Sequence, residues 1–223
     1  MTKLTGPFLV AAAMCFWTAW LLMPGVGITD AATILKVVSR HPRQVLVSSA
    51  VQLLAAALFS SAVPGLARLF SGAKNARMAA ATTLLAIGAC GVAADAIYHQ
   101  LAYEMVRPGI DQAAMLPVMQ RMQSTDLRLL MPMILAFLIG CVAFALGAAA
   151  AHVVPKANPW LYVLALGVGT TYGLVGGSTG VSGRIVGLAC LGCLSASVAW
   201  IGIALWRQER NSGEQDTRRW AKV

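Results

Sequence analysis

Charged residues are scarce in this sequence, and their scarcity excludes most soluble folds. Asp, Glu, Lys and Arg make up 11% of the 223 residues, whereas about 25% is usual in soluble domains. Hydrophobic residues account for 58%, and the mean hydropathy is +0.72. A soluble core of this size could not enclose so much apolar surface, but a lipid bilayer can solvate it. The composition therefore predicts an integral membrane protein whose main partner is the bilayer.

The sequence also has few residues for metal binding or catalysis, with three histidines and eight acidic residues. A metal site needs three or four ligands in one place, and the histidines are spread along the chain. The five cysteines fall inside apolar runs, so they do not form the disulfide framework of a secreted domain. We find no nucleotide-binding motif and no large soluble region. These absences favour a non-enzymatic protein that needs no cofactor.

The net charge of +9 does not indicate nucleic-acid binding, because the basic residues lie in short loops and near the C-terminus. Lys and Arg at such places set the orientation of a membrane protein and contact anionic lipid. They are more numerous on the side that holds both termini. The positive-inside rule therefore predicts that both termini are cytoplasmic.

Six apolar runs approach the roughly 20 residues that a helix needs to cross a bilayer. The second is expected to end at Pro64 and Gly65, and the fifth is short and rich in glycine. We predict an all-α fold: one six-helix transmembrane bundle over residues 1–206, followed by a charged cytoplasmic tail over 207–223. The six runs cover residues 7–23, 45–63, 78–103, 129–152, 160–175 and 184–206.

Two longer loops on the outer side carry signs of short helices. Asp30 and Asp111 stand where helix-capping residues are expected, and apolar residues then recur with helical spacing. Pro117 falls early in the second of these segments, which is therefore expected to be kinked or to begin after Asp111. We expect two short amphipathic helices that lie on the membrane surface or fold over the mouth of the bundle.

Several stretches of the chain occur in a familiar order. His41-Pro42-Arg43 precedes the second run, residues 64–69 (PGLARL) follow it, residues 91–99 (GVAADAIYH) lie in the third, and 137–160 span the fourth run and the following loop. These features resemble a group of small bacterial six-helix integral membrane proteins with no established activity, over roughly residues 29–163. The resemblance implies a multi-pass protein of the bacterial inner membrane and supplies no catalytic residues.

The most conspicuous polar feature is the pair Asp95 and His99 inside the third run. Four residues apart, they lie on one face of a helix. A carboxylate at membrane depth is costly and usually marks a functional site. Tyr98, Tyr103 and Gln52 are expected to add polar groups nearby. The competing interpretation is a purely structural contact between helices, worth on the order of 1 kcal/mol.

We therefore expect a pocket around Asp95 and His99 that faces the outside. It would bind a small hydrophobic or amphipathic ligand, or a partner membrane protein. The alternative is a proton-coupled secondary transporter in which the same two residues exchange the proton. The small size of the chain argues against a carrier unless the protein forms a homo-oligomer.

A copper site is a further alternative, because copper(I) accepts thioether ligands. His41, His99, Met119 and Met122 would supply it. Methionine, however, commonly fills gaps in an apolar helix face, and this explains the outer methionines more simply.

Two other motifs suggest chemistry. Cys190 and Cys193 form a C-x-x-C pair, as in membrane thiol oxidoreductases, but the second thiol pair needed for exchange is missing. Residues 176–180 match the G-x-S-x-G pattern of hydrolases, with Ser178 as its serine. Because that stretch is rich in glycine, we interpret it as helix packing followed by a turn.

Overall fold

The computed structural model describes residues 4–70, 76–174 and 180–220, and all of the regular secondary structure within them is α-helical. The all-α prediction is confirmed for these residues. The helices in chain order are α1 (Thr5–Leu22), α2 (Ala31–Arg40), α3 (Pro42–Phe70), α4 (Ala76–Glu104), α5 (Gln112–Ala150), α6 (Trp160–Leu174) and α7 (Gly180–Trp220).

Within the described residues, five helices are long and apolar enough to cross a membrane, which indicates a multi-pass membrane protein. The predicted count of six is not confirmed, because α6 has 15 residues. Such a helix is about 22 Å long, less than the roughly 30 Å of a hydrocarbon core. The five candidate spans are Thr5–Leu22, Pro42–Arg68, Met78–Glu104, Arg128–Ala150 and Gly183–Gln208.

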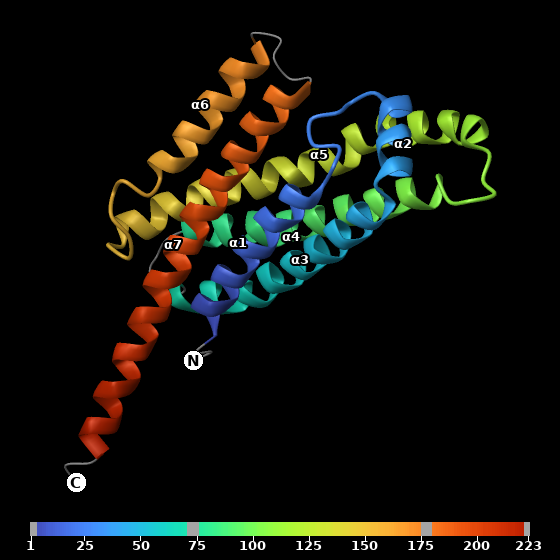
Figure 1. Cartoon of the computed structure of the whole chain (residues 1–223). Coiled ribbons are helices and arrows are strands. Elements are labelled where there is room, and N and C mark those ends of the chain that lie inside the picture. The colour runs from blue at the N-terminus through green and yellow to red at the C-terminus, as the bar shows by residue number, and fades with distance from the viewer. Residues whose placement is uncertain (1–3, 71–75, 175–179, 221–223) are drawn as a thin grey trace.

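Most of the helices pack side by side in the spatial order α6, α7, α1, α3, α4, α5 (Figure 1). α1 lies between α3 and α7, α4 lies between α3 and α5, and α6 packs on α7. The start of α1 and the end of α7 point to the same end of the bundle, which we call the terminal end. The short helix α2 packs on α3, α4 and α5 at the opposite end, which we call the α2 end. Cytoplasmic termini are still a prediction.

Two predictions about where helices begin and end are wrong. α3 does not end at Pro64 and Gly65 but continues to Phe70. The second amphipathic segment is not a separate helix, because α5 runs unbroken for 39 residues through Pro117 and Pro132. Helices in membranes tolerate proline when neighbouring helices or local adjustments compensate for the lost backbone hydrogen bond.

The first amphipathic segment does form a separate helix, α2. The Asp30 carboxylate caps it by accepting hydrogen bonds from the Thr33 backbone N–H (2.8 Å) and hydroxyl (2.6 Å). The hydrogen bond from the Thr33 hydroxyl lowers the pKa of Asp30 below its ordinary value, and the bond from the Thr33 backbone adds a smaller effect in the same direction. Leu35 and Val38 are buried on the face that meets the bundle. α2 is therefore fixed over the α2 end by a cap and by an apolar face.

Glycines allow α4 and α5 to approach closely. A Cβ at Gly88 would overlap the backbone of Phe137, and one at Gly91 would lie 2.7 Å from the Cβ of Met133. Gly140 of α5 meets the backbone of Leu85 in the same way. The close approach matches the small-residue packing that joins helices in membranes.

Candidate functional site

A cavity of about 610 Å³ lies beneath α2. Its wall is formed by the end of α1 and the loop after it, by α2 and α4, by the part of α5 that enters the span, and by Val45 of α3. Most lining side chains are apolar, among them Met23, Ile34, Leu130 and Ile134. The volume falls in the range of about 300–1,000 Å³ that is usual for ligand pockets.

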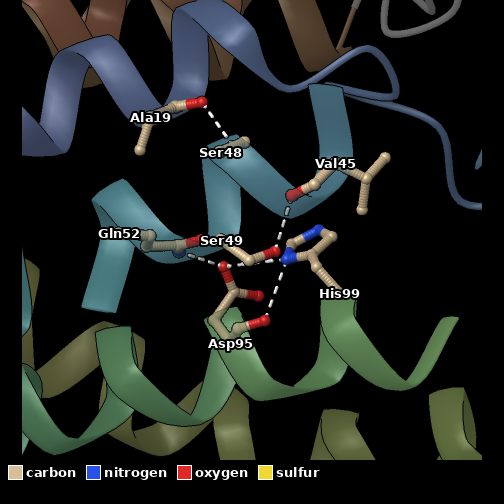
Figure 2. A network of polar contacts seen from close by, with 7 residues as sticks. All are labelled: Ala19, Val45, Ser48, Ser49, Gln52, Asp95 and His99. Carbon is tan, nitrogen blue, oxygen red and sulfur yellow. Dashed lines mark hydrogen bonds and ion pairs between the residues drawn. The ribbon is translucent and has the colours of Figure 1, made fainter. Parts of the chain in front are cut away.

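Asp95 is the acidic residue and His99 the histidine among the described residues that line this cavity, and both project from α4 towards α3 (Figure 2). Gln52 of α3 donates a hydrogen bond from Nε2 to Asp95 Oδ2 at 2.5 Å. His99 Nδ1 lies 2.9 Å from the backbone oxygen of Asp95 and 3.7 Å from its Oδ2. The side chains are 13% exposed for Asp95 and 16% for His99, so each retains an accessible surface.

The contacts of His99 fix where its proton lies. A carbonyl oxygen can only accept a hydrogen bond, so Nδ1 must carry the hydrogen that meets the Asp95 backbone. In the neutral ring the other nitrogen, Nε2, is then an acceptor. Within the described part of the chain, neither Nε2 nor Asp95 Oδ1 has a hydrogen-bond partner. These are the two polar atoms of the pair that a bound molecule could reach.

Two aromatic rings hold the imidazole in place. Trp20 of α1 packs edge-on to His99 with ring centroids 6.1 Å apart, and Tyr98 does so at 5.5 Å. The Tyr98 hydroxyl lies 3.9 Å from the sulfur of Met119, to which it donates. The position of His99 is therefore set by α1, α4 and α5 together.

Three phenylalanines close the bundle on the terminal side of the cavity. Phe16, Phe59 and Phe137 are all buried, and their ring centroids are 5.2–6.3 Å apart. They lie about one to two helical turns from Trp20, Gln52 and Ile134 respectively, towards the terminal end. The cavity is thus separated from the terminal half of the bundle by packed rings.

A hydrogen bond joins the loop before α2, which forms part of the cavity wall, to α5. Gln123 donates from Nε2 to the backbone oxygen of Thr29, just before the α2 cap, at 2.9 Å. Gln123 belongs to the first part of α5, which extends beyond the span that begins at Arg128. The cavity therefore lies where the apolar span meets the more polar α2 end.

The structure brings together most of the residues predicted for the site. Asp95, Tyr98 and His99 line the cavity. Gln52 is only 1% exposed and holds the Asp95 carboxylate by a hydrogen bond from α3. Tyr103 does not line it. It packs one turn beyond His99 against an apolar cluster under α2.

Trp20 and Gln123 also line the cavity, although the sequence does not identify them. Trp20 belongs to an apolar run whose faces the sequence does not distinguish, and Gln123 lies in the segment predicted to be a separate helix. Only the recurring polar residues of that segment point to a role for Gln123. Neither position could be assigned to the pocket before the packing of α1 and α5 was known.

The structure does not assemble the predicted copper ligands. His41 is exposed at the C-terminal end of α2 and does not line the cavity. Met119 is fully buried against Tyr98, and Met122 packs in the apolar cluster under α2. Among the described residues no three His, Cys, Asp or Glu side chains are grouped as a metal site requires.

Cys190 and Cys193 lie within α7 as free thiols. Cys190 donates a hydrogen bond to the backbone oxygen of Ala165 at 3.1 Å, which joins α7 to α6. Neither thiol lies at the helix N-terminus, where a reactive thiolate is favoured, because α7 begins at Gly180. Ser178 falls outside the described residues.

Comparisons of the chain with protein-family models, curated proteins and solved structures found no match.

Proposed function

We propose that this chain is a non-enzymatic membrane protein that binds a small amphipathic molecule in the cavity beneath α2. The observation that carries the proposal is the Asp95–His99 pair in the wall of an otherwise largely apolar cavity of about 610 Å³. Small-molecule sites combine an apolar lining with a few fixed polar groups in this way. A concave pocket also fits a small molecule better than the surface of a partner protein.

The exposure of the pair favours binding over a purely structural role. A contact that only joined α3 to α4 would be most stable if it were fully enclosed, because an ionised group at membrane depth is costly. Asp95 and His99 instead each present an atom without a protein partner to the cavity. A bound molecule would complete the hydrogen bonding of both.

The phenylalanine cluster favours a binding protein over a proton-coupled carrier. A carrier must expose its site alternately to both sides of the membrane, so Phe16, Phe59 and Phe137 would have to separate in every cycle. Uptake of a radiolabelled amphiphile into sealed vesicles, driven by a pH gradient and lost in Asp95→Asn, would support the carrier instead.

We expect Ile134→Trp to block binding by filling the cavity. Displacing about two methylene groups of a ligand removes roughly 1.6 kcal/mol of apolar burial, or more than tenfold in affinity. Native mass spectrometry of the purified protein with a dodecyl amphiphile would count the molecules bound. Ile139→Trp, on the lipid-facing side of the same helix and 56% exposed, is the matched control and should bind normally. Equal binding by the two variants would place the ligand outside the cavity.

A further inference from the structure

We infer that the headgroup of the ligand is an ammonium group that carries N–H, attached to a single apolar chain. This inference rests on the proposed function and specifies the substrate class of the same site. It follows from counting the donors, acceptors and charges that the cavity wall presents.

The donors next to the pair are either hydrogen-bonded or buried. Gln52 donates to Asp95 Oδ2, and His99 Nδ1 donates to the Asp95 backbone. The Tyr98 hydroxyl donates to Met119. The indole N–H of Trp20 has no hydrogen-bond partner, but it is buried and not exposed to the cavity. With Asp95 as a carboxylate and His99 as a neutral ring, the pair offers a ligand two acceptors, Asp95 Oδ1 and His99 Nε2. A headgroup with at least two N–H donors satisfies both.

The charges in the cavity wall also favour an ammonium headgroup. Asp95 supplies a carboxylate, and neither Lys nor Arg is among the lining residues. An uncompensated carboxylate beside an apolar cavity is unfavourable, and a cation that also donates hydrogen bonds to it offsets this cost. An anionic headgroup would add a second negative charge to the same place. The wall therefore selects a cation and excludes fatty acids.

The dimensions of the cavity restrict the apolar part. Its volume of about 610 Å³ is in the range of single drug-sized ligands, and the phenylalanine cluster prevents extension towards the terminal end. A single chain fits this space better than the two chains of a phospholipid. The shared chemistry, a primary ammonium on an apolar body, occurs both in free long-chain amines and in the headgroup of phosphatidylethanolamine.

Four probes with the same dodecyl chain test the inference. Binding of dodecylamine, dodecyltrimethylammonium, dodecanol and dodecanoate would be measured by native mass spectrometry at one fixed, mildly basic pH. We expect dodecylamine to bind at least about tenfold more tightly than each of the other three, because it alone combines charge with N–H donors. Competition by lysophosphatidylethanolamine, which carries the same headgroup on a single chain, would identify a lipid headgroup as the source of the amine, and lack of competition would identify a free amine.

Asp95→Asn is the variant that tests the role of the carboxylate. Asparagine keeps an oxygen that can accept the hydrogen bond of Gln52, so the variant should fold and melt like the wild type. Its preference for dodecylamine over dodecanol should fall to about twofold or less. A preference unchanged in Asp95→Asn, or dodecanoate bound as tightly as dodecylamine, would overturn the inference and leave amphiphile binding intact. If the wild type binds none of the four probes, the proposed function fails as well.

Discussion

Replacing Gln52 and Asp95 together by leucine is expected to give a stable protein that no longer binds dodecylamine. The single variant Asp95→Leu leaves the amide of Gln52 without its acceptor, although that side chain is only 1% exposed. An unpaired buried donor costs about 1–3 kcal/mol. In the double variant both partners are apolar, and such an exchange is nearly neutral or even stabilising.

Two readouts separate structure from function in this pair of variants. Thermal unfolding in detergent should show a loss of stability for Asp95→Leu and its recovery in the double variant. Dodecylamine binding should be lowered at least about tenfold in both, since neither has the carboxylate. Recovery of both stability and binding in the double variant would mean that Asp95 only joins α3 to α4.

Gly88→Leu is expected to have the largest effect on the fold. A side chain at this position meets the backbone of Phe137 on α5, which cannot move aside as a flexible side chain could. Overpacking of a well-packed core costs about 1–3 kcal/mol, so we expect the melting temperature to fall by roughly 5 °C or more. The change would also displace Phe137 from Phe16 and Phe59, which close the cavity.

The matched control for Gly88→Leu is Gly167→Leu on α6. Gly167 is exposed, and a Cβ built there meets no atom within 4 Å. The control should unfold within about 2 °C of the wild type. Similar losses in both variants would show that leucine is unfavourable at any glycine of these helices, and that the close contact of α4 with α5 is not the cause.

The spans could be predicted from the sequence because length and apolarity are local properties. The runs that became α1, α3, α4, α5 and α7 were found with ends shifted by a few residues or more. The errors at Pro64 and Pro117 have a common cause. Whether a proline ends a helix depends on what surrounds the backbone group that it leaves unpaired. That surrounding is set by neighbouring helices and cannot be read from the local sequence.

The site was predictable only in part, for a similar reason. The spacing of Asp95 and His99 is enough to place them on one face of a helix. The sequence did not indicate that Gln52 reaches Asp95 directly, because the depth at which α3 crosses α4 depends on packing. Tyr103 continues the same helix face but lies outside the cavity, since the position of α2 decides where the cavity ends. Trp20 joins the site only through the packing of α1.

Photoaffinity labelling tests most directly whether the cavity beneath α2 binds an amphiphile. The probe is dodecylamine with a diazirine at the end of its chain, and the adducts are mapped by digestion and mass spectrometry. We expect adducts on the cavity wall, within residues 20–38 and 130–134, that excess dodecylamine suppresses and that Ile134→Trp abolishes. Labelling spread over the exposed faces of α6 and α7, unaffected by competitor and by Ile134→Trp, would contradict the account.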